Sequence, residues 1–490
     1  MVRPDHRVGM GTRFHSFASR LGFAALALVV ACSDSPAGLP SPSDPEALLT
    51  DTQLSTPQDT IQVSVDPAWD QWVRSNHHTI RSLTSTRNDD LQFLKQVIGN
   101  RRLVQLGESG HGVREFNMAK VRLIRFLHEE MGFDVIAFES GLFECWKANE
   151  LAASSTAELT MRRCPFGVWH TDEVIKLFEY IRETKSTARP LILAGVDVQM
   201  SSTQMQFKYA PPILTEVVGK IDQAYAARLA VLEDGFYGEY SAASSSAPFE
   251  PARRAEIMGA LDDRMGYSAK YDSLQVFLDA NASALAAAYS TNPGIPLVAR
   301  QLAFSRVQTI LSGKATTLNA GSTTRDRGMA DNVDFLLDRL YPGKKVMVWA
   351  HNAHIMHART SMTMIGAPIT YPQSMGSFIS TRRRGDVYTI GLFMYRGFAA
   401  NNAGQSYSIR PPLPGSLEAT LYRARKQWTF IDMLSQSRTA ANSWMFDPIP
   451  AKEWGTQEVR FVPRAQFDGI LFIDTVNPPQ YFSATTNGGI

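Results

Sequence analysis

Short apolar runs, each followed by a polar or charged residue, recur along the chain. They are Leu103–Gly107 before Glu108, Val135–Phe138 before Glu139, Leu191–Val196 before Asp197, Val346–Ala350 before His351, Val387–Met394, and Ile470–Ile473 before Asp474. Continuous apolar runs of this length are typical of strands buried on both faces, as in a sheet that helices cover. Ligands bind beyond the carboxyl ends of strands in such sheets, so the polar residues that follow the runs are expected to face one crevice.

Helical patterns lie between these runs. Glu115–Met131 carries apolar residues on one face and is followed by Gly132, a stop signal, so the first two strands are predicted to be parallel and adjacent. Ile80–Ile98 also has helical spacing. Residues 211–340, rich in Ala, Leu and charge, predict a helical insertion that covers the crevice. The expected fold is α/β, with a central, largely parallel sheet flanked by helices.

The first 31 residues have the pattern of a secretory signal. Four arginines precede the apolar run Leu21–Ala31, which ends in Leu28-Val29-Val30-Ala31-Cys32. This ending predicts a lipoprotein signal peptide over 1–31 and lipidation of Cys32, and a Ser/Pro/Asp-rich tether over 32–65. We expect an exported lipoprotein of the bacterial cell envelope, periplasmic or outer-membrane-anchored, that meets the membrane only through its lipid. An ordinary signal peptide cut nearby is the alternative. The folded domain is expected over 66–490.

Removal of the signal changes the charge balance. Residues 1–31 contain four Arg and one Asp, a net charge of +3, so the mature chain has 2 − 3 = −1. With no basic stripe, this charge argues against a nucleic-acid partner. Two cysteines remain, Cys145 and Cys164, and the sequence allows either a disulfide or two buried thiols.

The turn Gly107-Glu108-Ser109-Gly110-His111-Gly112 follows the first apolar run. Its glycines allow a tight turn and a close approach to a ligand. Glu108 and His111 are three residues apart and can share one side of the turn. A carboxylate beside an imidazole raises its basicity and fixes its tautomer, as a general base requires. The alternative is a glycine-rich turn with a hydrogen-bonded, non-catalytic histidine.

Further candidates come from later segments. Eight histidines remain after the signal, and three of them fall in the seven residues 351–357, where His351 and His354 are candidate site residues and His357 is expected to be peripheral. His170 lies beside Thr171, a predicted N-cap, and could line the pocket or belong to the cap. Arg325, at the predicted start of a helix, could bind a substrate oxygen or a carboxylate.

Two common hydrolase designs are missing from the sequence. It contains no Gly-x-Ser-x-Gly elbow and no His-Glu-x-x-His helix. A metal site nevertheless stays open as an alternative, because the candidate residues offer the nitrogen and oxygen donors that zinc or manganese accepts. The donors are Glu108, His111, Glu139, Asp197, His351 and His354. We prefer the hypothesis of a site without a metal or other cofactor to that of a metal site.

At these residues the sequence resembles the erythromycin esterase family. The matching stretches are the turn 107–112 with Glu115-Phe116, Phe133 to Ser140, Gly195-Val196-Asp197, Arg325-Asp326 with Met329 and Asn332, Trp349 to His354, and Met375-Gly376-Ser377. The resemblance implies a hydrolase that opens a macrolide lactone with water, and possible antibiotic resistance. It also implies that His111 is the general base and that Glu108, Glu139 and His351 belong to the catalytic group. Lys120 matches a basic residue of the family on the helix after the first motif.

The expected mechanism follows from these residues. His111 would take a proton from water as it attacks an ester or lactone carbonyl, and Glu108 or Glu139 would position the imidazole. His351, with Arg325 or Lys120, would stabilise the oxyanion, and Lys120, Asp197, Arg325, His354 and His170 would contact the substrate. The rivals are a metal-dependent hydrolase built from the same residues, and a non-catalytic lipoprotein that binds a glycan or polyketide.

Overall fold

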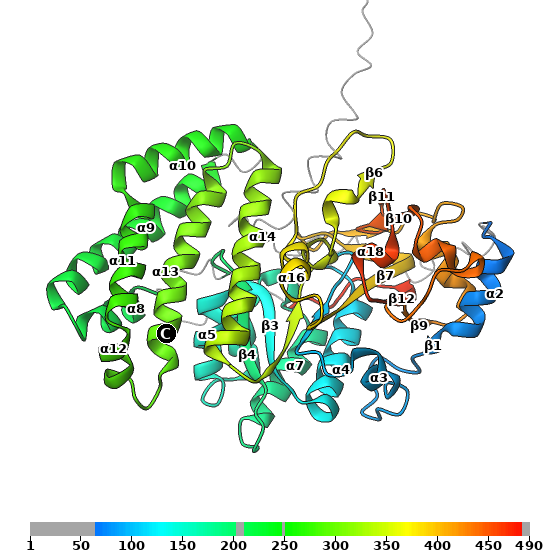
Figure 1. The fold of residues 1–490 in the computed structure, drawn as a ribbon, viewed down its shortest axis with the longest axis horizontal. Helices are drawn as coiled ribbons and strands as arrows, with labels where there is room; N and C mark the ends of the chain where they lie inside the picture. The colour runs from blue at the N-terminus through cyan, green and yellow to red at the C-terminus, as the bar shows by residue number, and fades with distance from the viewer. Residues whose placement is uncertain (1–63, 202–209, 247–249, 483–490) are drawn as a thin grey trace, which may run out of the picture.

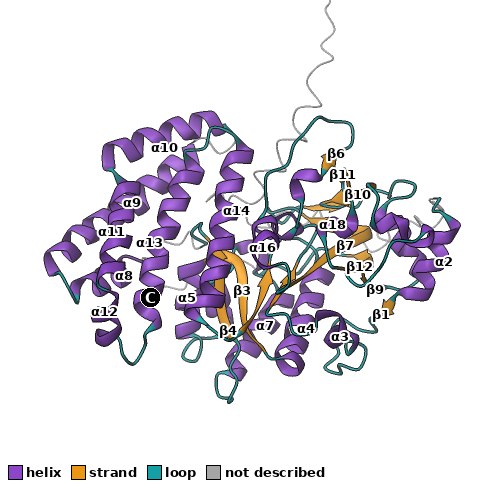
Figure 2. Ribbon diagram, viewed as in Figure 1, coloured by secondary structure: helices purple, strands orange, loops and turns teal. Residues whose placement is uncertain are grey.

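The computed structural model describes residues 64–201, 210–246 and 250–482. A large central sheet is flanked by helices (Figures 1 and 2), which confirms the α/β class expected from the apolar runs. The predicted signal peptide 1–31, the lipidation site Cys32 and nearly all of the predicted tether lie outside the described residues. None of the described helices combines the length and apolar character that a bilayer crossing requires.

The central sheet is mainly parallel in its middle and antiparallel at one edge. In spatial order its strands are β1 (His78–Thr79), β9 (Trp428–Asp432), β12 (Gly469–Val476), β7 (Val387–Ala400), β2 (Leu103–Leu106), β5 (Lys345–Trp349), β3 (Phe133–Gly141) and β4 (Ile192–Asp197), and β8 (Ser406–Ser408) pairs with β7. The strands from β12 to β4 pair in parallel, whereas β9 runs antiparallel to β12 and β1. A second, antiparallel sheet contains β10 (Ile449–Glu453), β11 (Gln457–Phe461) and β6 (Thr363–Met364).

Helices fill most of the connections. Those of the first half are α2 (Pro67–Asn76), α3 (Phe93–Ile98), α4 (Arg114–Met131), α5 (Leu142–Leu151), α6 (Ala157–Arg163), the 3-10 turn η3 (Gly167–Trp169) and α7 (Asp172–Thr184). Between β4 and β5 lie α8 (Ala210–Gly219), α9 (Gln223–Ser246), α10 (Pro251–Met265), α11 (Tyr267–Ala280), α12 (Ala282–Ala288), α13 (Gly294–Gly313), α14 (Leu318–Phe335) and η5 (Leu336–Leu340). The later ones are α15 (Asn352–Ile355), η6 (Arg359–Ser361), α16 (Met375–Arg383), α17 (Leu417–Leu421), η7 (Tyr422–Ala424), η8 (Ala440–Met445) and α18 (Pro463–Gln466).

Alternate residues of each central strand enter two different cores. In β2, Leu103 belongs to one core, together with residues of α13 and α14, and Val104 belongs to the other, together with residues of α4 and α7. Because both faces are covered by apolar side chains, the strands could be recognised as continuous apolar runs. The helices α8 to α13 gather beside the β4 edge of the sheet, at the left of Figure 1.

The predicted adjacency of the first two strands is wrong. β2 and β3 are parallel, but β5 lies between them and pairs with both. The crossover through α4 therefore skips one position, which a strand from more than 200 residues later in the chain fills. Local sequence pattern determines that a strand–helix–strand unit forms, but it carries no information about a strand inserted from elsewhere.

The predicted helix over Ile80–Ile98 is also largely wrong, because only α3 at its end is helical. The preceding residues form a loop around the buried guanidinium of Arg122. Arg122 donates hydrogen bonds to the carbonyls of Ser82, Ser85 and Arg87 and pairs with Asp90. A loop can bury apolar residues at helical spacing when a partner of this kind satisfies its backbone carbonyls.

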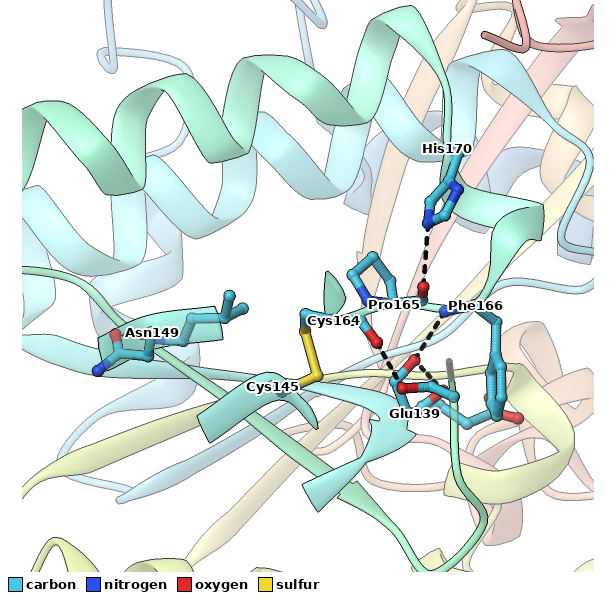
Figure 3. Close-up of a disulfide and its surroundings, with 10 residues drawn as sticks. Glu139, Cys145, Asn149, Cys164, Pro165, Phe166 and His170 are labelled. Carbon is cyan, nitrogen blue, oxygen red and sulfur yellow. Dashed lines mark hydrogen bonds between the residues drawn. A yellow bond between two sulfur atoms is a disulfide. The ribbon is translucent and has the colours of Figure 1, made fainter. Parts of the chain in front are cut away.

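Cys145 and Cys164 form a disulfide (Figure 3), which resolves the alternative left open by the sequence. Cys145 lies on α5, directly after β3, and Cys164 ends α6. Two residues further on, the Phe166 N–H donates to the Ser140 hydroxyl at 3.1 Å. The disulfide and this hydrogen bond hold the segment that leads to Trp169 against the carboxyl end of β3.

The segment 477–482, after β12, lies across the start of two helices. The Arg114 N–H at the start of α4 donates to the Asn477 carbonyl at 2.8 Å. The Asp172 N–H at the start of α7 donates to the Gln480 carbonyl at 2.9 Å. We call residues 477–482 the C-terminal clasp, because they satisfy backbone donors next to the turn 107–112 and next to Trp169.

Candidate active site

Four neighbouring strands bring the predicted polar residues together. Glu108, His351, Glu139 and Asp197 stand at the carboxyl ends of β2, β5, β3 and β4, which are adjacent in this order. Direct hydrogen bonds connect these ends. The Asn352 N–H donates to the Glu108 carbonyl at 2.8 Å, and the His351 N–H donates to Glu139 Oε2 at 2.9 Å. The expected convergence at one edge of the sheet is therefore present.

Glu108 is the centre of one buried cluster. Its Oε1 lies 2.6 Å from His111 Nδ1 and accepts the indole N–H of Trp169 at 3.0 Å. Its Oε2 pairs with the ammonium of Lys120. A carboxylate that accepts the Nδ1 proton leaves the lone pair on Nε2, which is the tautomer that a general base needs. Two donors besides His111 hold the carboxylate in place.

Lys120 lies behind Glu108, in the middle of α4, and its side chain is 0% exposed. Its ammonium lies 4.0 Å from the centroid of the Trp349 ring. Burial lowers the pKa of Lys120 to about 8, although the neighbouring Glu108 carboxylate raises it. The charge of this lysine therefore depends on pH close to neutrality, and its contacts are with Glu108 and Trp349.

The glycines of the turn make room for protein neighbours. A Cβ on Gly107 would lie 2.0 Å from Asn352 Oδ1, and a Cβ on Gly112 would lie 2.1 Å from the Ala400 carbonyl oxygen. Asn352 uses its side-chain amide to bond the backbone of Leu392 on β7, with Nδ2 donating at 3.0 Å. Gly107 thus allows β2, β5 and β7 to be linked at the point where Glu108 and His351 emerge.

We expect Gly107→Ala to lower the free energy of unfolding by about 1–3 kcal/mol, because the new methyl group overlaps Asn352 Oδ1 and lies 2.8 Å from Ile355 Cδ1. Urea unfolding monitored by circular dichroism measures this change. Gly385→Ala is the matched control, because a Cβ there meets nothing within 4 Å, and its effect should stay within about 0.5 kcal/mol. Equal stabilities of the two variants would contradict the packing argument.

Glu139 and Asp197 share one arginine. Arg325 donates from Nε to both oxygens of Asp197 at 3.1 Å, and its Nη2 lies 3.2 Å from Glu139 Oε1. Arg325 lies well inside α14, which begins at Leu318, so its predicted place at a helix start is wrong. Burial raises the pKa of Glu139, but His354 and Arg325 outweigh it and hold this pKa well below its usual range. Glu139 is therefore ionised.

His354 joins Glu139 to a further carboxylate. Its Nε2 lies 3.1 Å from Glu139 Oε1, and its Nδ1 lies 2.8 Å from Asp326 Oδ1. Both ring nitrogens face carboxylate oxygens, and both can donate only when the ring carries two protons. Asp326 was not predicted as a site residue, although it belongs to a stretch that matches the family. Its contact with His354, and with the Met375 N–H at 2.8 Å, makes it part of the site.

One ring nitrogen of His351 is hydrogen-bonded, and the other has no partner in the described part of the chain. Its Nδ1 accepts the N–H of Ala353 at 3.1 Å, so the proton of the neutral ring is on Nε2. Within the described part of the chain, this buried Nε2 has no hydrogen-bond partner. Burial, and then the neighbouring His111, lower the pKa of His351 well below its usual range. The ring is neutral at pH 7 and offers one unused donor, with its centroid 5.1 Å from that of His111.

Two tryptophans frame the histidines. Trp169 contacts His111 edge to face at a centroid distance of 5.0 Å, and Trp454 stacks on His351 at the same distance. Trp454 has a φ of 55°, in the left-handed region, and its N–H donates to the Ser109 carbonyl at 2.6 Å. Neither ring was predicted from the sequence. Trp169 directly precedes His170, a candidate residue, whereas no sequence motif marks Trp454, which lies between β10 and β11.

Two of the sequence-derived histidines lie apart from this group. His170 Nε2 is 3.1 Å from the Pro165 carbonyl (Figure 3), and burial lowers its pKa to about 4. The predicted N-cap beside it, Thr171, is confirmed, because its hydroxyl accepts the Val174 N–H. His357 Nε2 is 2.8 Å from the Thr389 hydroxyl. These contacts attach both histidines to the scaffold.

The carboxylates of the site are paired with cationic side chains. Lys120 and Arg325 occupy oxygens of Glu108, Glu139 and Asp197. In residues 64–201, 210–246 and 250–482, no group of three or more His, Cys, Asp and Glu side chains is arranged so that it could hold a metal ion. The carboxylates that the sequence offered for a metal are thus engaged in ion pairs, whereas His351 Nε2 has no hydrogen-bond partner among the described residues.

The acid–imidazole pair stands at the carboxyl edge of a parallel sheet, where ligands bind in open α/β folds. A family model described as erythromycin esterase matches residues 128–476. The YbfO protein of Bacillus subtilis (strain 168) is 31% identical over 432 residues, which cover 85% of this chain and 92% of that protein. The chain therefore belongs to the erythromycin esterase family, and its assignment is that of a hydrolase.

Two named erythromycin esterases are more distant. The type II enzyme from Escherichia coli is 24% identical over 342 residues, 68% of this chain and 78% of that enzyme. The solved structure of a His-to-Asn mutant of the erythromycin esterase EreC, in its open conformation, matches with a TM-score of 0.60 and 19% identity, over 82% of this chain and 98% of that one. This likeness shows a shared fold. The resemblance inferred from the sequence motifs is confirmed.

Proposed function

We propose that the protein adds water to a carboxylic ester or lactone and that His111 is the general base. The observation that carries the proposal is the contact between His111 Nδ1 and Glu108 Oε1 at 2.6 Å. The indole N–H of Trp169 donates to the same carboxylate oxygen. The contact orients the imidazole and stabilises the imidazolium that forms during the reaction. The names of the related esterases support this class of substrate, and a macrolide lactone is one member of it.

The reaction balances with the residues present. The oxygen of water attacks the carbonyl carbon, and His111 Nε2 takes the proton that water loses. The carbonyl π electrons move to oxygen and form a tetrahedral oxyanion. When the oxyanion collapses, the bond between carbon and the alcohol oxygen breaks, and His111 returns the proton to that oxygen. An ester gives an acid and an alcohol, and a lactone gives both groups on one opened molecule.

His351 is suited to stabilise the oxyanion. Its buried Nε2–H has no partner among the residues that the structure describes, and its ring lies beside that of His111. A buried donor without a partner costs free energy, which a developing negative charge can recover. Arg325 is engaged by Asp197 and Glu139, and Lys120 by Glu108, so we assign both cations to positioning the carboxylates.

We expect kcat/KM to fall as the pH rises through about 8, because Lys120 loses its proton there and Glu108 loses its cationic partner. A pH profile from 6 to 10 with a neutral ester measures this alkaline limb. Lys120→Met should have lower activity at pH 7 and no such limb. Lys185 is a matched control, because burial also lowers its pKa to about 8, while its ammonium contacts Asn149 Oδ1. Lys185→Met should keep the limb, and a limb that survives in Lys120→Met would exclude Lys120 as its origin.

The direct test incubates the protein with a panel of macrolides and simple carboxylic esters and follows the gain of one water by mass spectrometry. Turnover by the wild type but not by His111→Ala supports the proposal. Binding without turnover across the panel would favour the non-catalytic rival. Parallel assays after chelation, with metal analysis of the protein, test the metal-dependent rival, which predicts that activity is lost and then restored by the metal.

A further inference from the structure

Arg359 is a buried cation that forms no ion pair with any of the described residues. It opens η6, four residues after the end of α15, and is 8% exposed. In the part of the chain that the structure describes, its guanidinium makes no hydrogen bond or ion pair, and its Nε is a buried donor without a partner. Every other buried arginine discussed above, such as Arg122 or Arg325, is paired with a carboxylate.

A second unpartnered polar group lies beside it. The Arg359 guanidinium is 5.8 Å from the centroid of the Tyr371 ring. Tyr371 is 6% exposed, and its hydroxyl has no hydrogen-bond partner among the described residues. Burial, together with the nearby Glu453 carboxylate, raises the pKa of Tyr371 to about 12, so the hydroxyl keeps its proton and can donate it. Neither a hydrogen bond nor an ion pair joins Glu453 to Arg359.

Both groups lie on the His351 side of the site. The charge of Arg359 contributes to the lowered pKa of His351. Glu453 contributes to the raised pKa of Tyr371, and it directly precedes Trp454, whose ring stacks on His351. Arg359 and Tyr371 belong to the segment between α15 and α16. The ends of this segment are joined by Ser374, the N-cap of α16, whose hydroxyl donates to the Met356 carbonyl. Arg359 and Tyr371 therefore belong to the part of the site that contains His351 and Trp454.

An arginine stays charged at every pH at which proteins fold, and a buried charge without a partner is costly. The cost is recovered when a ligand supplies the anion. The planar fork of a guanidinium matches the oxygens of a carboxylate or phosphate, and a phenolic hydroxyl adds a third donor to the same group. A neutral macrocycle offers no such partner.

We infer that Arg359 and Tyr371 form a subsite for an anionic oxygen group, a carboxylate or phosphate carried by the substrate close to its scissile ester. Its placement beside a reacting carbonyl rests on the proposed hydrolase function. The subsite itself is a property of the two side chains and binds small anions whether or not an ester is turned over. The substrate class is then an acidic ester rather than a neutral one.

The test measures anion binding by isothermal titration calorimetry, with inorganic phosphate and with succinate as separate probes. We expect saturable binding of at least one probe to the wild type, and the tighter probe identifies the group. Arg359→Gln should weaken binding about tenfold or more, and Tyr371→Phe a few-fold, since each loses hydrogen bonds to a charged group. Arg460→Gln is the matched control, because Arg460 is exposed on β11 and contacts the Pro448 carbonyl, and its binding should equal that of the wild type.

Three results would overturn the inference: no saturable binding of either anion to the wild type, unchanged binding in Arg359→Gln, or an equal loss in Arg460→Gln. If Arg359→Gln does not fold, Tyr371→Phe decides, together with the rise in melting temperature that the bound anion gives the wild type. The ester assay separates this question from the proposed function. Arg359→Gln should lower kcat/KM for esters that bear a carboxylate or phosphate and spare neutral esters. An equal loss of kcat for neutral esters would contradict a binding subsite, and anion binding without hydrolysis of any ester would contradict only the proposed function.

Discussion

Replacement of His111 by alanine is expected to lower kcat by about 10²–10⁴-fold, the contribution of a positioned general base. The fold should survive, because Glu108 keeps its contacts with Lys120 and with the Trp169 indole. Turnover of the best ester from the panel measures the loss, and circular dichroism with thermal unfolding measures the fold. A change in kcat at nearly constant KM is expected, since the imidazole acts on water rather than on the bound substrate.

Two further variants make this prediction sharper. Glu108→Gln keeps the shape of the side chain but removes the negative charge beside His111 and Lys120, so it should also lose most of the turnover. His77→Ala, a histidine at the end of α2 that contacts the Val73 carbonyl, is the control and should behave like the wild type. Turnover by His111→Ala within a factor of about three of the wild type would leave no role for general-base catalysis at this residue.

Replacement of Arg325 by methionine is expected to lower the free energy of unfolding by about 3–5 kcal/mol, because it leaves buried carboxylates without their shared cation. Methionine keeps much of the volume and removes only the guanidinium. Glu139 would retain His354, whereas Asp197 has both oxygens on Arg325. Guanidinium chloride unfolding at pH 7 measures the difference.

A control variant and the pH dependence of stability test whether the lost ion pairs cause the lower free energy of unfolding of Arg325→Met. Arg460→Met removes an exposed arginine and should change stability by less than about 0.5 kcal/mol. The pKa of Glu139 is held well below its usual range in the folded protein. Glu139 therefore stabilises the wild type at every pH above the pKa that it has in the unfolded chain. This contribution is lost as the pH falls through the lower pKa that Glu139 has in the folded protein. Loss of Arg325 should reduce that dependence in the acid range. A variant as stable as the wild type would show that the ion pairs contribute no net stability.

The sequence predicted the strands well, because both faces of the sheet are buried. Each apolar run became a strand, and the polar residue after it stands at the carboxyl edge, so Glu108, Glu139 and His351 could be named from local pattern. The glycine turn added the pair with His111. These features depend on a few consecutive residues, which a sequence displays directly.

The remaining features depend on distant residues. β5 lies between β2 and β3, although it is more than 200 residues away in the sequence. Trp169, the partner of Glu108, and Trp454, the partner of His351, come from connecting segments without a recognisable motif. The apolar residues of the loop around Arg122 have helical spacing, but the loop is not a helix. Its backbone carbonyls accept hydrogen bonds from the Arg122 side chain on α4. Only the folded arrangement shows which of these side chains meet.

The C-terminal clasp has a consequence for the order in which the protein assembles. Synthesis proceeds from the N-terminus, so the turn with His111 leaves the ribosome about 370 residues before the backbone groups of Asn477 and Gln480 that bond beside it. Until then the starts of α4 and α7 have open backbone donors, and β7 lacks its neighbour β12. A chain that has not yet joined this last segment can thus hold every residue named in the proposed mechanism and still lack the finished site.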